Sequence, residues 1–209
     1  MSARRWLERR RHARSRGAAL VEFALVLPVI GLLVLGIFEY GNLWRQVGTL
    51  ERSVQQGART VTQQANGRFA DYEALRSVDS ATRGMSGVEI VRVIVYLPAD
   101  GDGSVPVGCF GGSVEGVCNT YSGDRVRTTN PVGFGVAGTA SNPTCAAGSW
   151  DEDWCPTERP RSDTNPMRVG VHVTAEYTPV TGLIPGPSLT VERQAVYQIE
   201  PCAQGQSGC

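Results

Sequence analysis

The chain has 209 residues, with 20 basic and 20 acidic side chains and a formal net charge of zero. This length fits one compact domain together with a separate N-terminal segment. The only basic cluster lies directly before an apolar run, which excludes the charge pattern of a nucleic-acid-binding protein.

Residues 1–17 form a basic leader that we expect to lie in the cytoplasm. Within residues 1–16 there are seven arginines and a single acid, Glu8. From Gly41 onward the chain has thirteen arginines and seventeen acids, a net charge of −4. The positive charge is therefore concentrated at one end of the chain.

The segment Ala18–Phe38 contains 21 residues and one charge, Glu22. As a helix it would be about 31 Å long, close to the thickness of a bilayer core. The arginines before it predict a cytoplasmic N-terminus and an exterior C-terminal domain. We interpret residues 18–40 as a transmembrane helix. Removal by an ordinary signal peptidase is the alternative, although the run is longer than a signal h-region and no A-x-A-like site follows it.

Residues 41–98 are predicted to form an exterior helix, a short helix and a first strand. Apolar side chains recur at helical spacing after the span, so that one helix from about Ala18 to Gln64 is expected, with a bend at Pro28. These side chains are Leu43, Val47, Leu50, Val54, Ala58 and Val61. A second helix is expected over Ala70–Thr82, and the branched residues of Val88–Pro98 predict a strand.

Residues 99–165 are rich in glycine and cysteine, and we expect a disulfide-pinned excursion with little regular structure, including a short hairpin around Tyr121. Six cysteines in an exported segment indicate disulfides, for which fifteen pairings exist. Short loops close at low entropic cost, which favours local pairs. The expected pairs are Cys109–Cys118, Cys145–Cys155 and Cys202–Cys209.

Residues 166–209 are predicted to hold the C-terminal strands and a tail. Alternating apolar residues predict strands over Met167–Pro179 and Ser188–Glu200. The predicted fold is α+β: a long N-terminal transmembrane-plus-exterior helix packs on a small antiparallel sheet of three or more strands, with a disulfide-rich irregular loop region. The apolar stripe of the helix would cover one face of this sheet.

Motifs of enzymes are sparse in this sequence. It contains no G-x-S-x-G, no H-E-x-x-H and no P-loop, and its two histidines, His12 and His172, fall on opposite sides of the predicted membrane. No C-x-x-C occurs, so a cysteine metal site is not expected. His172 is expected to be a packed strand residue. The sequence therefore predicts no catalytic residue, no metal and no cofactor.

The start of the apolar run carries a recognisable pattern. A basic leader ends in Gly17, four apolar residues follow, and then come Glu22 and Phe23. This arrangement resembles the type IV prepilin class. The longer stretch RGAALVEFALVLPVIGLLVLGIFEYG, with a following helix that ends in GART, resembles the TadE-like pilus assembly proteins, the pseudopilins of tight-adherence (Flp-type) pili. The resemblance covers roughly residues 14–60.

The resemblance implies a processing site and an assembly role. A prepilin peptidase would cut the Gly17–Ala18 bond, and the new amine of Ala18 can then be methylated. Glu22, with Phe23 beside it, would contribute to assembly by pairing with an N-terminal amine. The implied partners are the peptidase, other pilins and pseudopilins, the pilus machinery and the membrane. The implied location is the cell membrane, with the C-terminal domain at the cell surface or in the pilus.

Two other functions stay open at this point. One is a single-pass envelope protein whose exterior domain binds a ligand. The other is an exported, membrane-tethered enzyme, although the spacing of its His, Ser and Cys residues gives no reason to expect a catalytic constellation.

Overall fold

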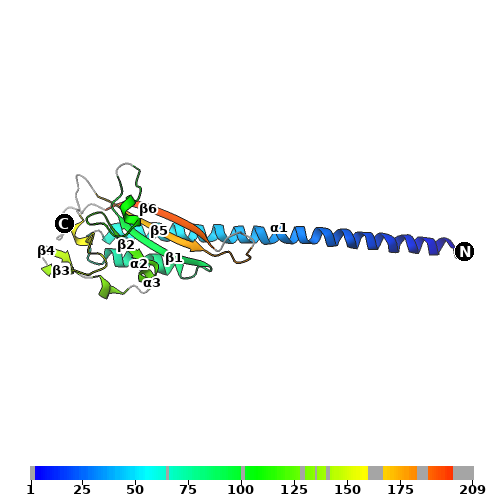
Figure 1. Cartoon of the computed structure of the whole chain (residues 1–209), viewed down its shortest axis with the longest axis horizontal. Helices are drawn as coiled ribbons and strands as arrows, with labels where there is room; N and C mark the ends of the chain where they lie inside the picture. The colour runs from blue at the N-terminus through cyan, green and yellow to red at the C-terminus, as the bar shows by residue number, and fades with distance from the viewer. Residues whose placement is uncertain are drawn as a thin grey trace.

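The computed structural model describes residues 3–64, 66–99, 102–127, 130–134, 136–139, 142–159, 167–182 and 188–199. Its dominant element is the helix α1 (Ala3–Gln64). Figure 1 shows that α1 extends far beyond the rest of the chain, which is gathered around the C-terminal part of the helix. We call this folded part, the described residues from 66 to 199 that pack around α1, the head.

The helix α1 begins earlier than expected. The predicted start was about Ala18, whereas the helix begins at Ala3. The leader is rich in Arg, Ala and other good helix formers and has no Pro or Gly before Gly17, so nothing in it stops a helix. The helix also continues through Pro28, and Figure 1 shows no sharp kink along it. The expected bend is not visible.

In the head, one side of an antiparallel sheet packs against two helices, one of which is α1. The sheet has four strands in the order β2-β1-β5-β6, and β3 and β4 form a separate two-stranded hairpin. The elements after α1 are α2 (Ala70–Thr82), β1 (Val88–Tyr96), η1 (Val107–Phe110), β2 (Cys118–Ser122), α3 (Gly123–Arg127), η2 (Pro131–Gly133), β3 (Val136–Thr139), β4 (Asn142–Cys145), η3 (Pro156–Glu158), β5 (Arg168–Tyr177) and β6 (Leu189–Gln198). The α+β prediction is confirmed, and so is the helix over Ala70–Thr82.

The prediction of a hairpin around Tyr121 is wrong. Tyr121 lies in β2 and pairs with Val93 of β1, so that this part of the excursion forms an edge of the main sheet. The side chain is buried in the core between the sheet and the helices. The excursion is thus more regular than its glycine content indicated. Burying an aromatic side chain in the core stabilises the fold more than leaving it exposed in a turn would.

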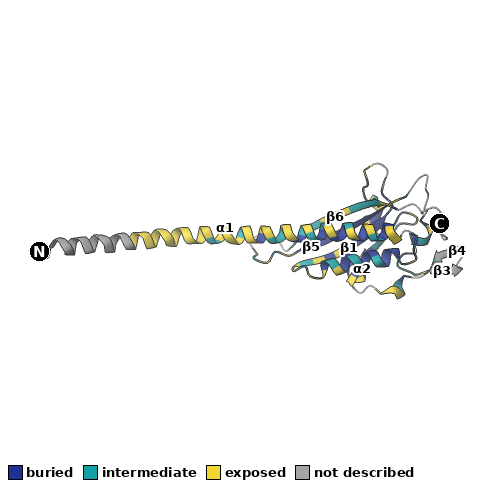
Figure 2. Cartoon of the chain, turned by 180° about the vertical axis from the view of Figure 1, so that it is seen from behind, coloured by how far each residue is buried: buried dark blue, intermediate teal, exposed yellow. Residues whose placement is uncertain are grey.

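The apolar stripe of α1 forms the centre of the main core, as predicted. Leu50, Val54, Ala58 and Val61 are all at most 1% exposed and pack with α2 and one face of the sheet. Figure 2 shows that the buried side of α1 begins only where the helix meets the head. Each fully buried Leu or Val contributes about 1.5–3 kcal/mol, so this stripe holds the head to the helix.

Two disulfides secure the excursion, and both have the predicted pairing. Cys109–Cys118 joins η1 to β2 and packs with Ile94 and Tyr96 on the sheet face opposite the helices. Cys145–Cys155 closes a short loop, because its two cysteines lie ten positions apart in the sequence. The third predicted pair, Cys202–Cys209, lies outside the described residues.

A buried ion pair ties the excursion to α2. Arg159 donates to both carboxylate oxygens of Asp71, at 2.6 and 2.8 Å, and both side chains are 0% exposed. Tyr121 and Asn119 of β2 donate to the same carboxylate at 2.8 and 2.9 Å. The guanidinium also lies 4.0 Å from the centre of the Trp154 ring. This network satisfies the charge of Asp71 and connects three distant segments.

Gly57 allows α1 and α2 to approach each other closely. A Cβ atom at this position would lie 2.9 Å from Cγ2 of Val78 in α2. Gly57 is the glycine of the GART motif, so the motif has a packing role in this fold.

We predict that Gly57→Leu destabilises the head by about 1–3 kcal/mol, because the larger side chain overpacks the contact with α2. Gly48→Leu is the matched control, since nothing lies within 4 Å of a Cβ atom at Gly48. A leucine there should be neutral or stabilising by up to about 1 kcal/mol through helix propensity. Denaturant unfolding of the detergent-solubilised chain measures both effects, and equal stability of the two variants would contradict the packing role.

We predict that Arg159→Met destabilises the head by about 3–5 kcal/mol, because it leaves the Asp71 carboxylate buried without its cation. The control is Arg83→Met, which removes the ion pair of Arg83 and Asp79, in which the arginine side chain is 70% exposed. This pair should contribute less than about 1 kcal/mol. The same unfolding measurement separates the two; similar losses would mean that the buried network does not hold the excursion.

Candidate functional site

Between Gly17 and Phe38, α1 exposes a long apolar surface. The described part of the helix holds one stretch that is long and apolar enough to cross a membrane. Residues in this stretch stand free of the head: Leu25 is 71% exposed, Leu33 61% and Ile37 74%. Figure 2 shows this part of the helix as exposed on all visible sides. A surface of this kind requires lipid or protein as its surroundings.

The predicted processing and assembly residues all lie on this free part of α1. Gly17, Ala18, Glu22 and Phe23 are exposed, and nothing lies within 4 Å of a Cβ atom placed at Gly17. The helix is unbroken across the Gly17–Ala18 bond. The head therefore does not cover this bond, although the bond lies within a helical turn.

Glu22 has no partner among the residues that the structure describes. It lies four residues after Ala18, so the two positions are about 6 Å apart along the axis and lie on the same side of the helix. In the uncut chain position 18 offers an amide and no charge. The structure therefore brings Ala18 and Glu22 together without giving the carboxylate a counter-charge.

Glu39 is a structurally important residue that sequence reasoning passed over. It is 1% exposed, although it follows the apolar run directly. Its carboxylate accepts hydrogen bonds from the hydroxyl of Tyr177 at 2.8 Å and from the backbone N–H groups of Val180 and Thr181 at 2.9 and 2.7 Å. It thus fixes the start of the β5–β6 connection to α1 at the level where the helix enters the head.

The hydroxyl of Tyr177 completes this junction. It accepts a hydrogen bond from Asn42 at 3.0 Å while it donates to Glu39. Burial, and then the hydrogen bond to Glu39, raise the pKa of Tyr177, so the tyrosine remains a donor throughout the neutral range. The sequence does hold a signal for Glu39: it lies four residues before Leu43 and so continues the stripe that packs on the sheet.

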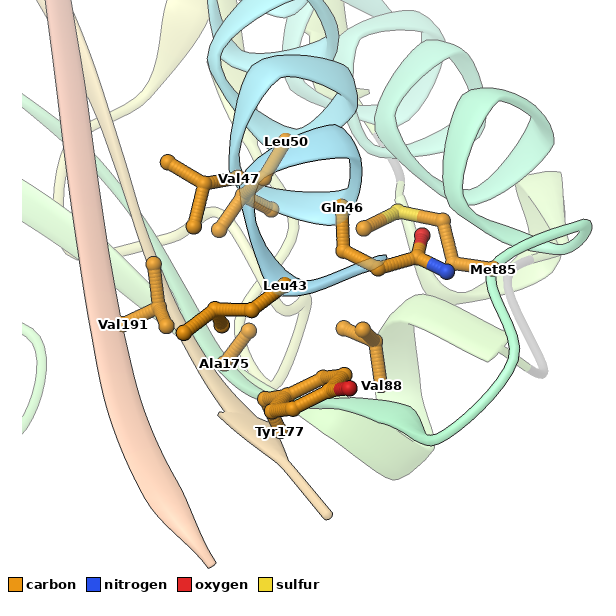
Figure 3. Close-up of a pocket in the computed structure, with 9 residues that line it drawn as sticks. All are labelled: Leu43, Gln46, Val47, Leu50, Met85, Val88, Ala175, Tyr177 and Val191. Carbon is orange, nitrogen blue, oxygen red and sulfur yellow. The ribbon is translucent and has the colours of Figure 1, made fainter. Parts of the chain in front are cut away.

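Apolar side chains pack directly behind this junction. Figure 3 shows side chains from α1 pointing toward the ends of β5 and β6 and toward the turn before β1. The set comprises Leu43, Gln46, Val47, Leu50, Met85, Val88, Ala175, Tyr177 and Val191. The amide of Gln46 also donates to the carbonyl oxygen of Ser86 at 3.4 Å. The crevice between them is small and apolar, and it serves packing more than ligand binding.

His172, the histidine of the described part of the head, is packed into the interior. His172 is 4% exposed, and its ring meets that of Phe110 edge-on at 5.4 Å, as expected for a packed strand histidine. Burial is also the main cause that lowers the pKa of His172. Within the described ranges no group of three or more His, Cys, Asp or Glu side chains could hold a metal ion.

We predict that Glu39→Ala releases the β5–β6 connection. The change leaves one hydroxyl and two backbone donors without their acceptor, at a cost of about 1–3 kcal/mol for each buried donor. Hydrogen exchange at the amides of Val180 and Thr181 should accelerate strongly. Glu51→Ala is the control, because Glu51 pairs with Arg193 at 3.2 Å at a partly exposed site on the same helix. Unchanged protection at Val180 and Thr181 in Glu39→Ala would contradict the role of this carboxylate.

Comparison with known proteins finds one family whose model matches residues of this same helix. Residues 17–59 match the model of the family described as TadE-like protein. No curated protein and no solved structure matches the chain. The match runs from Gly17 through Glu22 and Glu39 to the GART motif, and so covers the exposed apolar stretch and most of the stripe that packs on the head. Residues 17–59 of this chain are therefore similar to TadE-like proteins.

Proposed function

We propose that this protein is a minor pilin or pseudopilin that takes part in the assembly of a tight-adherence pilus or a related export system. The observation that carries the proposal is the TadE-like match over a helix whose first half is apolar and free of the head. Such a helix can stay in a membrane before assembly and pack among the helices of neighbouring subunits afterwards. The protein is on this account a structural component and not an enzyme.

The proposed topology places the N-terminus in the cytoplasm and the head outside. The arginines of the leader and the lack of such a cluster after the apolar run support this orientation. The two disulfides of the head support it as well, because disulfides persist in oxidising compartments.

The proposed processing step is cleavage between Gly17 and Ala18 by a prepilin peptidase. A glycine with open space around it suits a narrow cleavage site, and the bond lies at the boundary between the basic leader and the apolar run. Hydrolysis leaves the leader with a carboxylate on Gly17 and the mature chain with an ammonium on Ala18.

This new ammonium supplies the counter-charge that Glu22 lacks in the uncut chain. A lone carboxylate in hydrocarbon costs about 2.5–3.5 kcal/mol on insertion scales. Pairing with the amine of the same chain or of a neighbouring subunit offsets this cost, and pairing between subunits would favour assembly. The order of events would then be cleavage first and charge pairing second.

We predict that Gly17→Leu blocks maturation, so that the membrane-bound protein keeps its leader and runs as the larger precursor on gels. Gly31→Leu is the matched control, because Gly31 lies in the same helix with nothing within 4 Å of a Cβ atom. It should be processed normally. A Gly17→Leu protein that is cut like the wild type would rule out this peptidase site.

We predict that Glu22→Ala is processed normally but enters the assembled structure less than the wild type, because the ammonium of Ala18 loses its partner. Glu22→Gln keeps the size of the side chain and should show the same defect, which separates charge from shape. Co-purification with the assembled pilus measures the effect. Normal incorporation of both variants into the pilus would contradict the proposed charge pairing.

A further inference from the structure

Two aromatic side chains stand out at the point where α1 leaves its apolar stretch. Tyr40 is 64% exposed and Trp44 is 67% exposed, even with the head in place. They are four residues apart and so share one side of the helix. They follow Phe38, the last residue of the apolar run, by about 3 and 9 Å along the helix axis. This is the depth at which Tyr and Trp are enriched in membrane proteins, with the ring in the headgroup region.

The β5–β6 connection brings an apolar side chain to the same level. The N–H of Val180 donates to Glu39, the first residue after the apolar run, and yet the side chain of Val180 is 63% exposed. Figure 1 shows that β5 ends, and its connection to β6 starts, at the end of the head that faces the N-terminal half of α1. The start of this connection therefore lies beside the helix at the level where a membrane surface would cross it.

The charges at this level fit a lipid surface as well. The Glu39 carboxylate is buried and is used by three donors, so it does not face the headgroups. The exposed cation Arg45 lies one residue after Trp44, where a guanidinium can reach lipid phosphates while its stem lies along apolar surface.

We propose that Tyr40, Trp44 and Val180 form a lipid-contacting surface, which we call the exit patch, and that the head rests through it on the outer face of the membrane. The inference rests on the proposed function, because it requires the preceding segment to span the bilayer. Its occupant is the headgroup and upper acyl region of the lipid. The argument for lipid is continuity: the patch directly extends the exposed apolar surface of residues 18–38.

Contact between the head and the membrane surface would affect assembly. With the start of the β5–β6 connection held to Glu39 and Val180 at the interface, the head is fixed in height relative to the bilayer. Extraction into a pilus would then have to detach the exit patch from lipid in addition to removing the apolar helix. Membrane-bound subunits would be held at one common level until the machinery withdraws them.

Tryptophan quenching in lipid vesicles tests the exit patch. The full-length chain is reconstituted in phosphatidylcholine vesicles whose acyl chains carry bromine either near the headgroup or near the chain end. Trp44→Phe serves as the background, and Val180→Trp, Val132→Trp and Phe23→Trp are each added to it. Val132 is the matched control, since it is an 89% exposed valine of η2 that takes no part in the hydrogen bonds of Glu39.

The expected result has three parts. The wild type is quenched more than Trp44→Phe by bromine near the headgroup. The fluorescence that Val180→Trp adds is quenched by the same lipid and shifted to the blue, whereas that added by Val132→Trp is not quenched. Phe23→Trp is quenched most by bromine near the chain end, which reports that the span is inserted.

Three results would overturn the inference in different ways. If Phe23→Trp is quenched but Val180→Trp and Trp44 are not, the span is inserted and the head stands clear of the membrane, so the exit patch fails while the proposed function stands. A blue shift without quenching would assign the patch to contacts between subunits. If Phe23→Trp is not quenched, the span itself is wrong, and both proposals fall.

Discussion

The carboxylate of Glu39 marks the place where α1 changes its surroundings. Before it the helix exposes apolar side chains on all sides, and after it the same helix buries a stripe against α2 and the sheet. Three hydrogen bonds to Glu39 hold the end of β5 and the start of its connection to β6 at this level. Because a rigid helix transmits its position along its whole length, the head cannot tilt on α1 without breaking this junction. The proposed roles in membrane anchoring and assembly depend on this rigid coupling.

The rest of the head is secured by long-range contacts of other kinds. The excursion is held by two disulfides, by the pairing of β2 with β1 and by the ion pair of Arg159 with Asp71. These bonds and contacts hold the described parts of the glycine-rich excursion onto the head. The TadE-like match ends before this region. The match thus covers most of α1 and none of the excursion.

The features that were predictable from sequence are those with a local period. The stripe from Leu43 to Val61, the helix over Ala70–Thr82 and the alternating strands could be predicted because each follows from neighbouring residues. The two described disulfides were predictable for a similar reason, since their loops are short. Gly17, Ala18, Glu22 and Phe23 were singled out by resemblance, and the structure places them on the free helix without testing their roles.

Other features depend on partners that are distant in sequence. The role of Glu39 requires a strand 138 residues away, and the ion pair of Asp71 requires an arginine 88 residues away. Pairing of Tyr121 with β1 could not be inferred from the excursion alone. A register shift between Ile90 and Arg92 also turns both Ile90 and Val93 toward the helices, which simple alternation would have assigned to opposite faces. In each case tertiary contacts decide a position that the local pattern leaves open.

The central claim is that one helix serves first as a membrane anchor with a removable leader and then as the spine of an assembled subunit. Its two halves meet the physical requirements of these tasks: an exposed apolar segment that begins at the proposed cleavage site, and a buried stripe that carries the head. The most direct test is the N-terminal residue of the protein isolated from native membranes, determined by mass spectrometry of the intact chain. The account predicts a chain that begins at Ala18; a chain that begins at Met1 or Ser2 would contradict it.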